Sequence, residues 1–209
     1  MTRRLRLDVS FGIARLALAS PPRNTLDLAA FDELGDLVAG ALPGLDVTGL
    51  VVSGEGRHFS SGADIEELAA AFHGTPPRGA LLVAAHGDVL RAIEALPYPT
   101  VAAISGSCLG AGRELALACR FRVASRRAVM ALPEVEFGLM PGLGGVTRLA
   151  ALVGRARAAE LVLTGRTVDA EEGLAIGLVD AVVERASLAA RAEAVARDAA
   201  RTRSREVLP

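Results

Sequence analysis

The chain has 209 residues, of which 51% are hydrophobic and 22% charged, with 24 acidic and 23 basic side chains. A chain of this length forms one large domain or two small ones, and folding can bury about 70% of the surface of the unfolded chain. The net charge is close to zero, so nucleic acid is not an expected partner. Every run of about 18 residues contains a charge or a proline, so a membrane-spanning helix is not expected. The charged residues 1–6 are not followed by the apolar core of a signal peptide. We therefore expect a cytoplasmic protein with no membrane partner.

The amino-terminal half alternates strands with helices. Residues 5–9 and 13–18 each alternate apolar and polar side chains, which predicts an opening hairpin. In chain order, the following patterns predict a helix over residues 27–39, a buried strand over 49–53, helices over 64–72 and 79–95, and a second buried strand over 100–104.

The carboxyl-terminal half continues this alternation. Its predicted elements are a helix from about residue 113 to 119, strands over 121–124 and 128–132, helices over 146–153, 156–163 and 169–177, a strand over 178–183 and a helix from 188 to about 203. Asp169 and Glu172 form a pattern like a capping box at one helix start. We therefore predict an α/β domain over residues 1–183, followed by a C-terminal helix and tail over residues 184–209.

A glycine-rich turn follows each of the two buried strands and precedes a helix. Backbone N–H groups at such turns have no partner within the helix and point outward, so they can hold an anion or a developing oxyanion. Two such turns could flank one carbonyl oxygen, although they could equally do no more than reverse the chain. A dinucleotide site is not favoured, because Leu115 stands where the last glycine of that motif would be, and Ser107 lacks the Gly-x-Ser-x-Gly context of a nucleophile.

Two glutamates lie near these turns in the sequence. Glu114 falls in the first turn of a predicted helix, and Glu134 follows Pro133 among apolar residues. Two carboxylates beside an oxyanion site could hold a water molecule and move protons to and from it. The alternatives are a helix-stabilising acid at Glu114 and an exposed loop acid at Glu134.

The remaining reactive residue types indicate no metal site and no bound cofactor. Cys108 and Cys119 are too few for a cysteine zinc site, and the histidines share no metal-ligand spacing. The chain contains no lysine, which excludes Schiff-base chemistry and a Walker-type phosphate loop.

Five ordered segments resemble the enoyl-CoA hydratase/isomerase (crotonase) family: residues 59–65, 104–119, 133–149, 161–165 and 175–180. The resemblance implies a crotonase-like (ClpP/crotonase) spiral of ββα units with a truncated C-terminal helical region. It also implies an acyl-CoA thioester as substrate, with coenzyme A as part of the substrate rather than a cofactor, and a homotrimer or hexamer.

The same resemblance implies the catalytic residues. The family's two oxyanion N–H groups fall on Ala63 and Ala111, and members that hydrate a 2-enoyl-CoA carry two glutamates, which here are Glu114 and Glu134. Isomerases of the family generally keep only the second. The resemblance therefore favours an enoyl-CoA hydratase of fatty acid metabolism, in which Glu114 accepts the proton of water and Glu134 protonates the α-carbon.

The resemblance also implies a substrate groove, and Arg57 is a candidate for a CoA phosphate. The expected substrate-binding residues are Arg57, Ser61, Ala63, Asp64, Ile65, Glu66, Ala111 and Gly112. We expect Leu68, Leu82 and Leu143 in the apolar lining of the acyl pocket.

Several positions depart from the family pattern. Ala111 stands where glycine is usual, Arg120 replaces a frequent aspartate, and Arg113 stands where a small residue is common. If Arg113 points inward, we expect its charge to lower the pKa of Glu114. Family members also typically continue further at the C-terminus. These departures leave open an enoyl-CoA isomerase, a cyclic dienoyl-CoA hydratase, an acyl-CoA hydrolase or a non-catalytic acyl-CoA-binding subunit.

Overall fold

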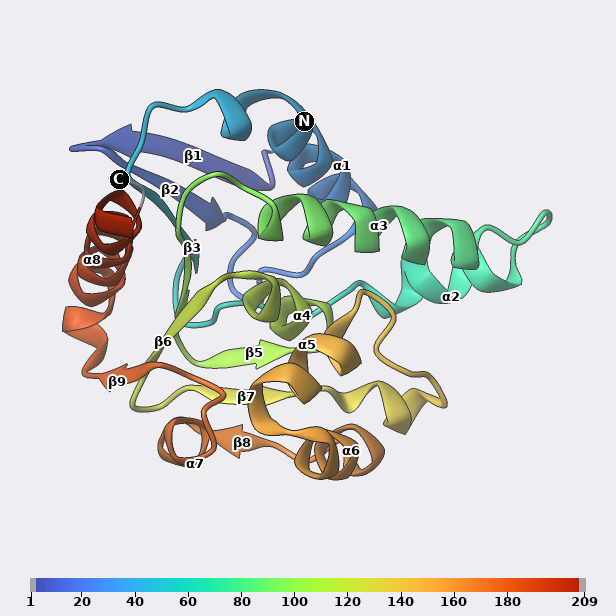
Figure 1. The fold of residues 1–209 in the computed structure, drawn as a ribbon. Coiled ribbons are helices and arrows are strands. Elements are labelled where there is room, and N and C mark those ends of the chain that lie inside the picture. The colour runs from blue at the N-terminus through green and yellow to red at the C-terminus, as the bar shows by residue number, and fades with distance from the viewer. Residues whose placement is uncertain (1–2, 207–209) are drawn as a thin grey trace.

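The computed structural model describes residues 3–206, and its strands form two sheets (Figure 1). The larger sheet has the order β1 (Leu5–Ser10), β2 (Ile13–Leu18), β3 (Gly49–Gly54), β4 (Thr100–Ile104), β6 (Phe121–Ser125) and β9 (Ala181–Val183). The smaller sheet has the order β5 (Ser107–Leu109), β7 (Val129–Ala131) and β8 (Val168–Asp169). β1 and β2 form the expected antiparallel hairpin, and β2, β3, β4, β6 and β9 run parallel.

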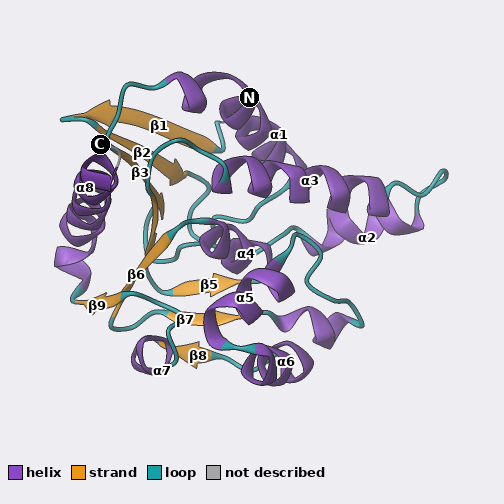
Figure 2. Ribbon diagram, in the orientation of Figure 1, coloured by secondary structure: helices purple, strands orange, loops and turns teal. Residues whose placement is uncertain are grey.

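The described residues form the helices α1 (Leu28–Asp36), α2 (Ile65–His73), α3 (Gly79–Glu94), α4 (Ala111–Ala118), α5 (Gly145–Val153), α6 (Arg155–Thr164), α7 (Ala170–Ala175) and α8 (Leu188–Glu206). Several of these helices cover the two faces of the larger sheet. In Figures 1 and 2, α8 lies alone on one side of this sheet, and α2 and α3 project together from the opposite side. In the part of the chain that the structure describes, no helix has both the length and the apolar character needed to cross a bilayer.

The two faces of the larger sheet belong to separate apolar clusters. Leu50, Val52 and Ile104 point into the main core beneath α1, α3 and α4. Val51 and Val101 are register partners and point the other way, toward α8. Side chains alternate along each strand, so a parallel strand covered on both faces is apolar throughout. This explains the continuous apolar runs at residues 49–53 and 100–104.

The predicted helices and the longer predicted strands are confirmed, with shifts of a few residues at their ends. Asp169 accepts the backbone N–H of Glu172 at 2.8 Å, which confirms the predicted cap of α7. The three-residue β5 and the two-residue β8 were not predicted, because such short strands have no detectable period. The strand predicted over residues 178–183 is wrong for its first three residues: Leu178 and Val179 N–H donate to the Gly173 carbonyl, and β9 begins at Ala181.

Candidate active site

A cavity of about 430 Å³ lies where α2, α3 and the loop after β7 meet the start of α4. Of the residues selected from the sequence, those that line it are Ser61, Ala63, Ile65, Leu68, Ala111, Glu114, Glu134 and Leu143. The rest of the lining is mainly apolar and includes Phe31, Phe72 and Val83. The structure therefore brings both glycine-rich turns and both glutamates to one cavity.

The two turns pack directly against each other. Leu109 N–H donates to the Ser60 carbonyl at 3.0 Å, and Ser60 forms a parallel bridge with Cys108. Gly62 has φ +98°, and a Cβ there would lie 2.9 Å from the Leu109 carbonyl oxygen, so only glycine fits. This close approach positions Ala63 beside Ala111.

Among the described residues, the N–H groups of Ala63 and Ala111 have no hydrogen-bond acceptor. Leu26 forms a parallel bridge with Ala63, but its N–H donates to the Gly62 carbonyl at 2.8 Å and its carbonyl accepts the Asp64 N–H at 3.3 Å, so both bonds go to the residues that flank Ala63. Ala111 is the first residue of α4, where an N–H has no acceptor within the helix. Two such donors at one cavity can stabilise an oxyanion.

Glu114 is 2% exposed and holds the glycine-rich loop that precedes α5. Its Oε1 accepts the N–H groups of Leu143 and Gly145, each at 2.8 Å. Burial raises the pKa of Glu114 to about 7; the Glu134 charge also raises it, while the two N–H donors and Arg148 lower it. A carboxyl that titrates near neutral pH can both give and take a proton.

Glu134 lies in the short 3₁₀ helix Pro133–Phe137 and is partly buried. Its Oε2 is buried and has no hydrogen-bond partner among the described residues. Burial raises the pKa of Glu134, and its own backbone N–H and the charge of Arg113 oppose that rise. Two interacting carboxyls ionise less readily together than either does alone, and the Glu134 charge is one cause of the raised pKa of Glu114.

Four of the residues selected for substrate binding lie outside the cavity lining. Arg57 is exposed in the loop after β3. Asp64 caps α2 by accepting the N–H groups of Glu66 and Glu67, each at 3.0 Å. Glu66 is exposed on the first turn of α2, and Gly112 packs so closely that a Cβ would lie 2.5 Å from Ser60 Cβ.

The sequence did not single out the part of the cavity that α1 and α3 form. Leu82 does not line the cavity, whereas Val83 and His86 of the same helix do. His86 stacks on Phe31 with ring centroids 3.9 Å apart and planes at 4°. Burial lowers the pKa of His86, and Asp32 opposes this. Helical spacing placed Phe31 on a buried face, but it could not show that α3 would meet α1 there.

Arg113 points inward, but the expected effect on Glu114 is wrong. The side chain is 1% exposed, and its electrostatic neighbours are Cys108, Glu134 and Arg166. On a helix, adjacent residues project about 100° apart, so Arg113 and Glu114 point in different directions. The positive charge therefore acts on the other glutamate.

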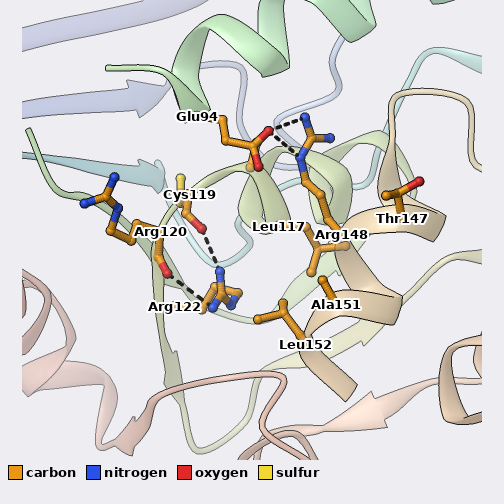
Figure 3. A pocket seen from close by; sticks show the side chains of 10 residues that line it. Glu94, Leu117, Cys119, Arg120, Arg122, Thr147, Arg148, Ala151 and Leu152 are labelled. Atoms are coloured by element: carbon orange, nitrogen blue, oxygen red, sulfur yellow. Dashed lines mark hydrogen bonds and ion pairs between the residues drawn. The ribbon is translucent and has the colours of Figure 1, made fainter. Parts of the chain in front are cut away.

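A second cavity, of about 420 Å³, lies at the C-terminal end of α4 (Figure 3). Arg148 there donates to Glu94 Oε2 at 2.9 Å. Arg122 donates to the Cys119 carbonyl at 2.6 Å and to the Leu178 carbonyl at 2.9 Å. Arg120 lines this cavity as an exposed residue. Its lining contains neither a pair of carboxylates nor either of the two glycine-rich turns, so the first cavity is the candidate active site.

Comparison with known proteins identifies the family. The family model described as enoyl-CoA hydratase/isomerase matches residues 8–207. A peroxisomal bifunctional enzyme of Danio rerio is 43% identical over 176 residues, which is 84% of this chain and 23% of the relative. A probable enoyl-CoA hydratase of Bacillus subtilis is 37% identical over 84% of this chain and 67% of the relative. The chain spans about a quarter of the length of the multifunctional relatives that it matches.

Solved structures share the fold. Pseudomonas aeruginosa DspI superposes with a TM-score of 0.88 at 36% identity, covering 96% of this chain and 81% of that chain. A protein from Thermobifida fusca YX described as a putative enoyl-CoA hydratase, solved in complex with CoA, superposes with a TM-score of 0.84 at 30% identity, covering 99% of this chain and 79% of that chain. The fold is therefore the crotonase-like α/β fold, and the chain belongs to the enoyl-CoA hydratase/isomerase family.

Proposed function

We propose that the chain is an enoyl-CoA hydratase, which adds water across the 2,3 double bond of an acyl-CoA thioester. One observation carries the proposal: Glu114 and Glu134 line the same cavity as Ala63 and Ala111. Water addition needs a proton acceptor, a proton donor and a site for the enolate oxygen. The cavity provides a candidate for each.

In the proposed reaction, the N–H groups of Ala63 and Ala111 bind the thioester oxygen and stabilise the enolate that forms when water attacks the β-carbon. Glu114 accepts a proton from the attacking water, and Glu134 delivers a proton to the α-carbon. After turnover Glu114 holds the proton and Glu134 is ionised, so a proton must move back between them. Burial raises the pKa of Glu114 to about 7 and also raises the pKa of Glu134, which supports a role for each carboxyl in proton transfer.

The cavity and the relatives support an acyl-CoA substrate. Apolar side chains such as Leu68, Phe72 and Leu143 suit an acyl chain, and a family member with the same fold has been solved with CoA. In this proposal the backbone of residues 63–66 borders the CoA groove, and Arg57 remains the candidate for a CoA phosphate. Assembly as a homotrimer or hexamer is part of the proposal, and sedimentation velocity tests it.

The test is the loss of the conjugated-thioester absorbance of crotonyl-CoA when purified protein is added. We expect decay, with 3-hydroxybutyryl-CoA as the product. Crotonyl-CoA that binds without reacting would contradict the activity for this substrate. Migration of the double bond in a 3-enoyl-CoA would then indicate an isomerase, and release of free CoA would indicate a hydrolase. Conversion of a cyclic dienoyl-CoA would indicate the corresponding hydratase. Binding without any conversion would indicate a non-catalytic subunit.

A further inference from the structure

Arg113 is a buried cation whose guanidinium has no hydrogen-bond partner. It is 1% exposed, and its Nε, Nη1 and Nη2 atoms are all buried and unpaired among the described residues. Buried charges in proteins are normally paired and hydrogen-bonded, because removing a charge from water is costly. A buried guanidinium without hydrogen bonds is stable only if a nearby opposite charge offsets the cost of removing it from water.

Among the groups that interact electrostatically with Arg113, Glu134 is a carboxylate, and one of its oxygens is itself unpaired. Glu134 Oε2 is buried without a hydrogen-bond partner. The start of α4 is fixed beside this glutamate, because Gly110 N–H donates to the Ala131 carbonyl at the end of β7 at 3.0 Å. A Cβ at Gly110 would lie 3.4 Å from Glu134 Oε1. Arg113 does not line the cavity, so its charge acts through the protein interior.

Other charged groups around this pair do not replace Arg113. Arg166, just after α6, pairs with Glu160 and Glu172 at 2.5 and 2.7 Å, so its charge is largely neutralised. Cys108 of β5 is a fully buried thiol, and burial raises its pKa to about 12, which keeps it neutral.

Other titratable groups line the cavity or act on Glu114. His86 of α3 lines it, and burial lowers the pKa of His86, which favours its neutral form. Arg148 of α5, which pairs with Glu94, acts on Glu114. Glu136, on the same 3₁₀ helix as Glu134, also lines the cavity and adds negative charge. Within residues 3–206, Arg113 is thus the cation that lacks a hydrogen-bond or ion-pair partner and acts electrostatically on Glu134.

We propose that Arg113 is a positioning residue whose buried charge keeps Glu134 ionised, so that the single proton of the glutamate pair rests on Glu114. The inference rests on the proposed function for its chemical consequence, but not for its test.

This arrangement prepares the pair for the reverse reaction, the dehydration of a 3-hydroxyacyl-CoA. The α-carbon–hydrogen bond breaks, the proton goes to Glu134, and the electron pair moves to the thioester oxygen at the N–H groups of Ala63 and Ala111. The enolate then re-forms the carbonyl as the bond from the β-carbon to the hydroxyl oxygen breaks, and that oxygen leaves as water with the proton of Glu114. Hydration instead requires the proton to move first from Glu114 to Glu134.

The test follows the carboxyl ¹³C resonances of protein labelled with [δ-¹³C]glutamate through a pH titration. Glu114→Gln and Glu134→Gln assign the two resonances by removing one each. In the wild type we expect Glu134 to ionise at lower pH than Glu114. In Arg113→Met, which keeps the side-chain length without the charge, the Glu134 midpoint should move up by about one pH unit or more. Arg113→Lys keeps the charge and should leave the order of titration unchanged.

Two results would overturn the inference: a wild-type protein that keeps its proton on Glu134, or a folded Arg113→Met protein with an unchanged Glu134 midpoint. The first needs no variant at Arg113, so the inference stays testable if Arg113→Met does not fold. The titration needs no turnover, so a failure to hydrate crotonyl-CoA is a separate result. If the protein does turn over, the acid limb of kcat/KM for dehydration of 3-hydroxybutyryl-CoA should move up in Arg113→Met and not in Arg113→Lys.

Discussion

Glu114 lowers the stability of the folded protein at neutral pH because its carboxyl is buried. Its pKa is about 7 in the folded protein, against an ordinary value of 4.5. As pH rises from 4.5 to 7 the unfolded chain releases this proton first, so the unfolded chain binds fewer protons and stability falls. Glu114→Gln has no proton to lose and keeps an oxygen for the N–H groups of Leu143 and Gly145.

We therefore expect the difference in unfolding free energy between Glu114→Gln and the wild type to change by about 2 kcal/mol, in favour of the variant, as pH rises from 5 to 8. Urea unfolding at both pH values measures this difference. If the stability difference between the two proteins is the same at pH 5 and pH 8, the carboxyl is not held protonated in the fold.

Each glutamate is also expected to be needed for turnover. Glu134→Gln and Glu114→Gln should each lower kcat for crotonyl-CoA hydration by about 10²–10⁴-fold, because each removes one proton-transfer step. The affinity for crotonyl-CoA, measured by calorimetry, should stay within a few-fold of the wild type, since the N–H groups of Ala63 and Ala111 remain. Full activity in Glu134→Gln would rule out the proposed proton donor.

At the residue scale, the sequence was most informative where the backbone is constrained. Gly62 and Gly110 both adopt positive φ beside Ala63 and Ala111, and such turns leave a glycine pattern that can be recognised. The direction of the Arg113 side chain leaves no such pattern, because it depends on where β5 and β7 pack against α4. The same holds for His86, whose contact with Phe31 joins helices far apart in the chain.

At the scale of elements, one side chain fixes the loop that carries the first glycine-rich turn. Asn24 is 1% exposed and adopts φ +50°. Its Nδ2 donates to the Glu55 and His58 carbonyls, each at 2.8 Å, and its Oδ1 accepts Ser20 N–H at 3.1 Å. Ser60 Oγ in turn donates to the Asn24 carbonyl at 2.7 Å and accepts Gly62 N–H at 3.0 Å.

Asn24→Ala should destabilise the protein by about 2–4 kcal/mol, because it leaves these buried backbone groups unpaired. It should also lower kcat/KM, since the turn at Gly62 is no longer held. Asn24→Gly loses the same bonds but tolerates the positive φ, and should be about 1 kcal/mol more stable than Asn24→Ala. The exposed Arg23→Ala is the control for stability, with a change within about 0.5 kcal/mol. An Asn24→Ala protein as stable as this control would contradict the role of Asn24.

The elements that could be predicted are those long enough to show a period. The strand over residues 100–104 and the helix over 79–95 were recognisable because each buries a face of several side chains. β5 was not, since its three residues were indistinguishable from the glycine-rich turn around them. Yet β5 pairs with β7, and these two strands lead into α4 and Glu134. Sequence patterns therefore showed the two glycine-rich turns but not the strand pairing that holds α4 beside Glu134.

At the scale of the molecule, α8 closes the face of the larger sheet that points away from the cavity. Ala192 and Ala196 are fully buried there, in a cluster with Val51, Val101 and Val123. A Cβ at Gly49 would lie 2.8 Å from Ala196 Cβ, so the helix approaches the sheet as closely as small residues allow. The proposed boundary between residues 183 and 184 therefore separates segments that share a core.

Ala196→Leu should force α8 away from the sheet and destabilise the protein by about 1–3 kcal/mol, because this packed surface has no room for three more carbon atoms. Ala190→Leu, at an exposed position on the same helix, is the matched control and should change stability by less than about 0.5 kcal/mol. Because α8 and the cavity lie on opposite faces, kcat/KM of the folded Ala196→Leu protein should match the wild type.

Circular dichroism during urea unfolding should show one transition, since α8 and the sheet share a core. A separate early loss of helix, with the rest of the transition unchanged, would instead show that residues 184–209 unfold as an independent unit.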